Sequence, residues 1–517
     1  MGDGKAGEDA EVRQMNEATA VPVTRRYAAY ALGLLTAINL LNYLDRNVIF
    51  ALFEPLKRDL DLTDTQLGWL GSAYILVYSL AALPLGVLSD LRSRRAVIAG
   101  GVAVWSAFTF FGGLVRSFWQ LFACRAVVGI GEAAFAPAAS SLVADYYPGK
   151  GRAAAMGVLS AGLAIGGVLG ILLGGTLEQL YGWRIAFMVV GVPGFLLALL
   201  ASRLIDPSGR GGPVPVRPYV KEEGLVTTVL QFYPLILSVV IGVTAAFVLD
   251  WHYGEDSRAD VAAFGAIVGI GVVMQIWFWV RSIRMGKLDR TPFGHDAHTT
   301  LDGLLDALLR VLRTPTLVYV FIAGAMISFG MNGLVGWGPT FITRELGLSS
   351  GEAARLLGVT GLVAGVSGTL AGGLIADWWL KRNSRARVLT VALGLLIGGP
   401  LAVWLMTMRD PGMFRAWFGV AFFFLSWYNG PLSATIFDVV PGRISATVAG
   451  AYFLFIHLAG DAIAFPLVGI LSDRFGLEHA VFVLPAVSIT GGLVVLGAAG
   501  KLTRDIARVA EEGRAPA

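Results

Sequence analysis

Four ionisable side chains stand inside apolar stretches of the sequence. Asp45 and Arg46 lie in "NYLDRNVIF" (42–50), and Arg125 and Glu132 lie in "CRAVVGIGEA" (124–133). A charge at the centre of a bilayer costs about 2.5 to 3.5 kcal/mol on insertion scales, so unpaired charges are rare there. Two acids and two bases sum to zero if their segments face one another. These residues are therefore candidates for a charged site inside a membrane.

Helical spacing allows such a meeting. Arg125 and Glu132 are seven residues apart, nearly two turns, so they share one helix face about 10 Å apart along the axis. In the first segment, Asn42 and Arg46 share a face, and Asp45 follows Asn42 by three residues. This arrangement predicts a polar stripe directed toward the interior of a helical bundle.

The four charges suggest a coupling chemistry. We hypothesise that Asp45 and Glu132 exchange a proton while Arg46 and Arg125 hold a phosphate or carboxylate by bidentate hydrogen bonds. An anion that occupies the arginines would free the carboxylates to take up a proton. Which carboxylate is the main titrating group stays open, because the two form a coupled pair. The alternative is a static ion-pair network, although buried pairs seldom repay their desolvation.

Composition places these segments in a membrane protein. The chain has 517 residues, of which 56% are hydrophobic and 15% charged, and its mean hydropathy is +0.68. A soluble domain has more charge than this. The net charge of +4 comes from basic residues in short loops, a topology signal rather than a nucleic-acid surface. Cys124 is the only cysteine, so a disulfide framework and a cysteine metal site are excluded.

Apolar runs long enough to cross a bilayer predict an all-α polytopic fold with 14 spans. Two six-span halves, 27–204 and 316–500, flank a link, 205–315, with two additional spans; polar tails cover 1–26 and 501–517. The first run of the link ends at the acidic "DWHYGEDSRAD" and the second at the basic "RSIRMGKLDR". The alternative for this link is one long soluble loop.

Two further features of the link and its flanks complete the topology. The segment "TLDGLLDALLRVLR" has leucines at helical spacing, which predicts an amphipathic helix on the inner membrane surface or under the bundle. With a cytoplasmic N-terminus, cytoplasmic segments carry most of the 40 Lys and Arg residues. The bias predicts that both termini lie in the cytoplasm and that the protein resides in the plasma (inner) membrane.

The two halves contain similar sequence segments at corresponding positions. "PLGVLSD" resembles "AGGLIAD", which aligns Asp90 with Asp377, and "VADYYPGKGRAAAMG" resembles "IFDVVPGRISATVAG", which aligns Asp145 with Asp438. Two related six-span halves joined by a long link are typical of a transporter whose site lies at the midplane between them.

The segment "GVLSDLRSRR" (86–95) resembles the signature loop of the major facilitator superfamily, although Leu91 and Ser93 replace its usual Arg and Gly. The resemblance implies that Asp90 contacts the N-terminus of the span that starts near Ser445 and so holds an inner gate closed. The residues expected at this inner gate are Asp90, Arg94, Arg95 and Asp377. The alternative is a basic loop that only sets topology.

The segment "GGVLGILLGG" (166–175) resembles the antiporter motif of the same superfamily, with Ile171 where proline is usual. Glycines at this density allow close helix packing. Packing explains the motif at least as well as antiport.

Within the superfamily, "NYLDRN" and "CRAVVGIGEAAFAP" resemble both the spinster-like transporters and the organic-anion/proton symporters that carry sugar acids. The stretch "HLAGDAIAFPLVGILSD" (457–473), preceded by "DVVPGRISAT", is specifically similar to the spinster-like family. This resemblance implies substrates related to lysolipids or sphingolipids.

The second half contributes fewer polar residues to the predicted site. The residues expected to contact substrate are, besides Asn42, Arg46 and Arg125, the residues Asn332, Tyr428, Asn429, His457 and Asp461. His457 and Asp461 share a helix face, and they form either a structural pair or a substrate- or pH-sensing pair. A charged wall opposite an apolar wall favours an amphiphile with an anionic head.

The sequence thus predicts a proton-coupled secondary transporter that moves an anionic amphiphile by alternating access. Alternatives are a sugar-acid/proton symporter, a drug/proton antiporter, a channel, or a membrane enzyme or receptor. His295 and His298 have a metal-like spacing, but no further ligands accompany them, and no nucleotide-binding loop is present. We expect no catalytic residue, no metal and no cofactor beyond the proton gradient. The expected partners are the substrate and membrane lipids, without nucleic acid, and the protein is expected to be a monomer.

Overall fold

The computed structural model describes residues 23–91, 93–148, 151–207, 309–441 and 444–512, together with single positions between 238 and 281. Within these ranges every regular element is helical, which confirms the all-α prediction. The first set of helices is α2 (Arg25–Val48), η1 (Ile49–Leu52), α3 (Phe53–Asp59), α4 (Asp64–Leu91), α5 (Arg94–Gly112), α6 (Phe118–Ala133), α7 (Phe135–Tyr146), α8 (Arg152–Tyr181) and α9 (Trp183–Ser202).

The second set follows the link and ends near the C-terminus. It contains α14 (Pro315–Glu345), α15 (Ser350–Leu380), α16 (Ala386–Leu405), α17 (Pro411–Leu425), η4 (Ser426–Tyr428), α18 (Asn429–Asp438), α19 (Ser445–Ile456), η6 (His457–Asp461), α20 (Ala462–Phe475), α21 (Leu477–Ala480) and α22 (Val483–Glu512). The element η6 is a single turn of π-helix between α19 and α20.

Capping residues explain where several of these helices begin. The side chain of Ser117 accepts a hydrogen bond from the first turn of α6, and Ser349 and Glu352 form a capping box at the start of α15. Asp410 caps α17, which opens on Pro411. These side chains satisfy backbone N–H groups that the first helical turn leaves without partners. Polar residues in short loops therefore set the helix boundaries.

Among the residues that the structure describes, ten helical segments are long and apolar enough to cross a membrane. With α4 and the α17–η4–α18 run, they make two sets of six. The two additional spans expected at 225–249 and 261–281 lie outside the described residues apart from single positions. The same holds for His295, His298 and most of the expected amphipathic helix.

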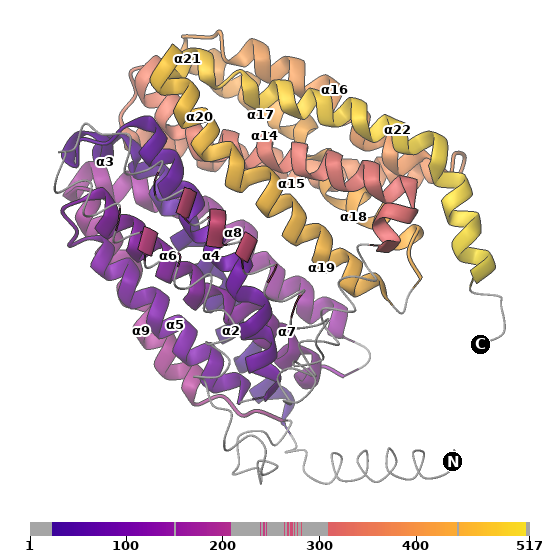
Figure 1. The fold of residues 1–517 in the computed structure, drawn as a ribbon, viewed down its shortest axis with the longest axis horizontal. Helices are drawn as coiled ribbons and strands as arrows, with labels where there is room; N and C mark the ends of the chain where they lie inside the picture. The colour runs from indigo at the N-terminus through magenta and orange to yellow at the C-terminus, as the bar shows by residue number, and fades with distance from the viewer. Residues whose placement is uncertain are drawn as a thin grey trace.

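The two sets fold into two bundles that lean against each other (Figure 1). Between the bundles, α4 packs along α20 and α8 packs along α15. Within the bundles, α2 packs along α8, and α14 packs along α22. One apolar core continues through both bundles near α3 and α20, where Phe50 stacks on Phe465 with ring centroids 4.9 Å apart.

The internal repeat has a structural counterpart. In the first bundle Arg94 Nη2 donates to Asp145 Oδ2 at 2.6 Å, and in the second Arg387 Nη1 donates to Asp438. Both pairs span 51 positions of sequence, so the aligned aspartates accept from corresponding arginines. The two bundles thus use the same ion pair to join their third and fourth helical segments.

The glycine-rich motif of α8 is a packing surface. A Cβ atom on Gly166 would meet the Leu40 carbonyl oxygen of α2 and lie 3.0 and 3.1 Å from the carbonyl carbon and Cα of Leu40. We therefore expect Gly166→Ala to lower the apparent melting temperature in detergent, corresponding to about 1 to 3 kcal/mol of overpacking. Gly157→Ala on the same helix is the control, because no atom lies within 4 Å of its added Cβ. Equal melting temperatures for the two variants would contradict the packing role.

Candidate functional site

The structure brings the four charged residues of the first bundle together as two crossed pairs. Arg46 Nε donates to Glu132 Oε2 at 2.6 Å, and Arg125 Nη1 donates to Asp45 Oδ1 at 3.0 Å. Each pair joins α2 to α6. The adjacent residues Asp45 and Arg46 therefore reach different partners, and the charges cancel between helices. Thr109 of α5 donates a further hydrogen bond to Asp45.

Three tyrosine rings surround the guanidinium group of Arg46. Its Cζ atom lies 4.7 Å from the ring centroid of Tyr43, 5.6 Å from that of Tyr74 and 4.5 Å from that of Tyr78. The Tyr74 ring also lies 5.4 Å from Cζ of Arg125. Ring faces attract cations, most strongly where water is excluded. The three rings therefore stabilise the charged guanidinium group of Arg46 beside Glu132.

A cavity of about 350 Å³ lies between the two bundles, and Arg46 is on its wall. The first bundle contributes Tyr43, Asn47 and Tyr74 to the same wall. Aromatic rings from both bundles make the apolar part of the lining: Phe50, Phe418, Phe422 and Phe465. The described lining therefore combines the guanidinium group of Arg46 with a broad apolar surface.

The second bundle places a polar network on the facing wall of the cavity. His457 Nδ1 lies 2.9 Å from Asp461 Oδ2, Ser328 donates to Asp461 Oδ1 at 2.9 Å, and Asn332 Nδ2 lies 3.1 Å from Ser328 Oγ. His457, Asp461 and Asn332 line the cavity. His457 and Asp461 are the ends of the π-helical turn η6, and such turns are frequent at functional sites.

Several predicted site residues lie behind the cavity wall. Asp45, Arg125 and Glu132 are each 1% exposed and Asn42 is 2% exposed, whereas Arg46, at 8%, reaches the lining. Glu132 is hydrogen-bonded to the lining residue Arg46. Sequence spacing identified the cluster, but it could not show which member faces the cavity, because that depends on how each helix is rotated.

Tyr428 and Asn429, also predicted to contact substrate, are not among the cavity-lining residues. Asn429 Nδ2 donates to Thr369 Oγ1 at 3.1 Å and to the Ser426 carbonyl at 3.3 Å. These contacts tie α18 to α15 across the 3-10 turn η4, which interrupts the α-helical phase between α17 and α18. The described contacts of Asn429 thus stay within the second bundle.

The residues expected at the inner gate lie in networks within each bundle. Arg94 is buried and donates to Asp206, Asp145 and Ser141 at 2.6 to 3.3 Å. Arg95 donates to the Leu204 carbonyl at 3.3 Å. In the second bundle, Asp377 lies 3.9 Å from Arg387. The side chain of Asp90 is outside the described part of the chain, so the predicted gate contact stays a prediction.

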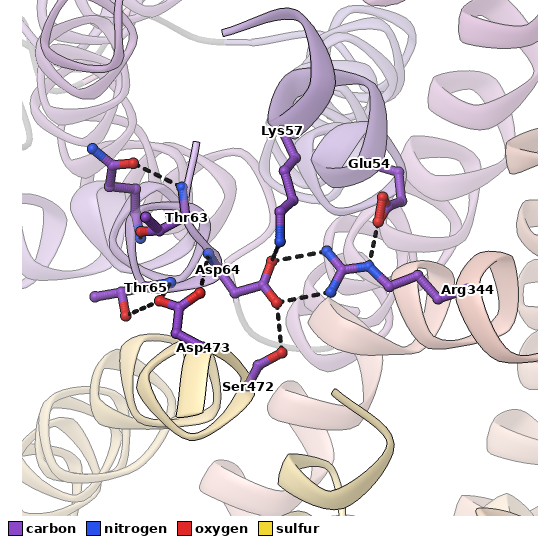
Figure 2. Close-up of polar contacts among 9 residues, drawn as sticks. Glu54, Lys57, Thr63, Asp64, Thr65, Arg344, Ser472 and Asp473 are labelled. Atoms are coloured by element: carbon purple, nitrogen blue, oxygen red, sulfur yellow. Dashed lines mark hydrogen bonds and ion pairs between the residues drawn. The ribbon is translucent and has the colours of Figure 1, made fainter. Parts of the chain in front are cut away.

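A second charged cluster, at the end where α3 leads into α4, joins the two bundles (Figure 2). Arg344 of α14 donates to Asp64 Oδ2 at 2.7 Å and Oδ1 at 2.8 Å, and it also donates to Glu54. Lys57 Nζ lies 2.6 Å from Asp64 Oδ1, and Ser472 Oγ donates to Asp64 Oδ2 at 2.5 Å. Sequence reasoning missed this cluster. We call it the α3–α4 cluster.

Comparisons with known proteins agree with this architecture. The sequence pattern of the Major Facilitator Superfamily matches residues 35–460. An MFS-type efflux pump of Mycolicibacterium smegmatis is 27% identical over 93% of this chain and 95% of its own length. The sphingosine-1-phosphate transporter SPNS2 of Xenopus tropicalis is 22% identical over 92% of this chain and 82% of its own.

A solved structure shows the same fold. A bacterial homologue of the human lysosomal transporter Spinster, in an inward-facing and unoccupied conformation, has a TM-score of 0.67 and 22% sequence identity, with 96% of this chain and 100% of that chain covered. Fold, site and comparisons together define a multi-pass membrane transporter rather than an enzyme. The chain belongs to the Major Facilitator Superfamily. Within it, the chain is spinster-like, as predicted.

Proposed function

We propose that this protein is a proton-coupled secondary transporter that moves an anionic amphiphile across the membrane by alternating access. The observation that carries the proposal is the position of Arg46. This residue faces the cavity, yet its guanidinium group is paired with Glu132 behind the wall. An anionic head group that enters the cavity competes with Glu132 for the same guanidinium group.

The coupling step follows from this competition. When the anion binds Arg46, Glu132 loses its positive neighbour in a buried setting, and the neutral carboxyl form becomes favoured. Oε1 of Glu132 has no hydrogen-bond partner among the described residues, so this oxygen can take up a proton without the loss of a hydrogen bond. The pair Asp45–Arg125 forms a second, coupled proton site. Substrate binding and proton uptake thereby support each other.

The lining favours an amphiphile over a small sugar acid. Phe50, Phe418, Phe422 and Phe465 supply an apolar surface for a hydrocarbon tail. His457, Asn332 and Asp461 on the facing wall offer hydrogen bonds to polar atoms between the tail and the charged end. The name of a relative, the sphingosine-1-phosphate transporter SPNS2, supports this substrate class. The efflux-pump relative supports drug/proton antiport as the alternative.

We also propose 14 spans, with both termini in the cytoplasm of a plasma (inner) membrane. The apolar runs at 225–249 and 261–281, with acidic residues after the first and basic residues after the second, support the two additional spans. In this orientation the α3–α4 cluster lies at the outer face. A tag inserted near residue 255 should be labelled from outside in intact cells, and labelling only after permeabilisation would contradict the topology.

The substrate proposal is tested with purified protein in proteoliposomes. We expect radiolabelled lysolipid to accumulate under an imposed pH gradient, and a sugar acid and a cationic drug to show no such uptake. Gradient-driven uptake of the sugar acid without uptake of lysolipid would overturn the substrate class. Equal lysolipid uptake with and without the gradient would overturn proton coupling. Empty liposomes and liposomes with Arg46→Ala protein serve as controls.

A further inference from the structure

One pentapeptide occurs at the ends of two helices in different bundles. The sequence "GVLSD" (86–90) lies at the end of α4, and "GILSD" (469–473) lies at the end of α20. The two copies differ only by Val against Ile. The internal repeat does not explain this match, because α4 is the second span of its half and α20 closes the fifth.

In the copy at α20, every repeated polar residue contacts the start of α4 (Figure 2). Asp473 Oδ1 accepts from Asp64 N at 2.9 Å, and Asp473 Oδ2 accepts from Thr65 N at 2.9 Å and Thr65 Oγ1 at 2.5 Å. Ser472 donates to the carboxylate of Asp64. A carboxylate of one bundle thus caps the N-terminus of a helix in the other, where it also complements the helix dipole.

The glycine of this copy makes the approach possible. A Cβ atom on Gly469 would meet the Asp64 carbonyl oxygen and lie 2.7 Å from the Asp64 carbonyl carbon and 2.8 Å from Thr65 Cα. Only glycine lets α20 lie this close to the first turn of α4. Glycine, serine and aspartate of the pentapeptide therefore each have an observed role in one contact, which we call the GxLSD clasp.

The two helices run antiparallel, which fixes where the other copy falls. Asp473 meets Asp64 at one end, and Ser72 donates to the Ala462 carbonyl at 2.8 Å further along. Each step along α4 thus matches a similar step back along α20 and η6. If the same pairing continued to the end of α4, Asp90 would fall opposite the first turn of α19, which begins at Ser445. Among the described residues, α4 packs along α20 and η6 but not along α19.

We propose that the two GxLSD copies are reciprocal clasps on one helix pair and that the transport cycle exchanges one for the other. The clasp at Asp473 closes the α3–α4 end, as observed. In the opposite state, Asp90 and Ser89 cap α19 in the same way, with Gly86 allowing the approach. This inference rests on the proposed alternating access and adds Asp473 as the counterpart of the expected inner-gate residue Asp90.

The test measures conformation in full-length protein in lipid nanodiscs without substrate or pH gradient. Spin labels at Leu180→Cys and Phe475→Cys report the α3–α4 end, in a background with Cys124→Ala. A second pair at Ser202→Cys and Arg382→Cys reports the opposite end. All four sites are exposed. Distance distributions between labels then give the ratio of the two states for each variant.

Asp473→Asn replaces one acceptor oxygen by a donor facing backbone N–H groups, so it should shift the ratio roughly tenfold toward opening at the α3–α4 end. Asp90→Asn should shift the ratio of the two states toward closure of the α3–α4 end. The double variant should return toward the wild-type ratio. Ser472→Ala should shift it in the direction of Asp473→Asn by less. Asp410→Asn is the control, since Asp410 caps α17 within its own bundle and Asn also caps.

The proposal is overturned if Asp473→Asn and Ser472→Ala leave both distances as in the wild type, or if Asp473→Asn and Asp90→Asn shift the ratio in the same direction. A double variant that opens further at one end than either single variant also overturns it. Transport does not enter this measurement, so a wrong substrate or a wrong proton site leaves the outcome unaffected.

Discussion

Glu132→Gln should reduce proton-gradient-driven uptake of lysolipid by roughly tenfold or more, while lysolipid binding is retained or strengthened. Glutamine cannot take up a proton, and it releases Arg46 from the charged partner that lies 2.6 Å away. The guanidinium group then becomes more available to an anionic head group. The measurement is initial uptake in proteoliposomes with and without a pH gradient, together with equilibrium binding of the same lysolipid.

Two variants make this result specific. Asp45→Asn removes the other carboxylate of the cluster, and comparison of its gradient dependence with that of Glu132→Gln shows which residue is the main proton carrier. Glu352→Gln is the matched control, because Gln retains the capping box of α15 and Glu352 is not among the cavity-lining residues. Undiminished gradient-driven uptake by Glu132→Gln would show that Glu132 does not carry the proton.

Arg94→Ala is expected to destabilise the first bundle by about 3 to 5 kcal/mol, the cost of removing one partner of a buried ion pair. The side chains of Arg94 and Asp206 are 2% and 1% exposed, so Asp206 would keep its charge without the guanidinium group. Thermal unfolding in detergent measures the loss. Arg95→Ala is the control, since the Arg95 side chain makes one long hydrogen bond to the Leu204 carbonyl.

A compensating pair of substitutions separates charge from packing. Arg94→Met with Asp206→Leu removes both buried charges together, and apolar replacements of a buried pair are often neutral or stabilising. We expect the double variant to recover most of the stability lost in Arg94→Ala. If the double variant is as unstable as the single one, the ion pair is not the source of the loss.

The charged core of the site could be predicted from sequence because few charges stand in apolar runs. The seven-residue spacing of Arg125 and Glu132 correctly placed both on one face of α6, toward α2. The crossing of the pairs could not be predicted, since Asp45 and Arg46 are neighbours and helix rotation decides their partners. Tyr43 was within reach of the same reasoning, because it precedes Arg46 by three residues.

The α3–α4 cluster was not predictable by the same means. Glu54, Asp64 and Arg344 lie at helix ends, where charged residues are common and usually solvated. Asp64 and Arg344 are 280 positions apart, and no spacing rule relates residues in separate bundles. The repeated pentapeptide was the one feature of the sequence that pointed to this end of the bundles. Its role became clear only from the hydrogen bond between Asp473 and the first turn of α4. The all-helical, membrane-spanning class could be predicted from hydropathy, because ten segments of the described residues are long and apolar enough to cross a bilayer.

The GxLSD clasp at Asp473 also bears on how the chain is made. Thr65 and Asp473 are 408 positions apart, so the first turn of α4 receives its cap only after α20 has been synthesised. Domains generally fold as units with the N-terminal one first during synthesis. Until α20 is present, the first bundle must therefore be stabilised by its own ion pairs, Arg46–Glu132, Arg125–Asp45 and Arg94–Asp206. Closure of the α3–α4 end therefore waits for the synthesis of α20, and truncation before α20 leaves that end without its cap.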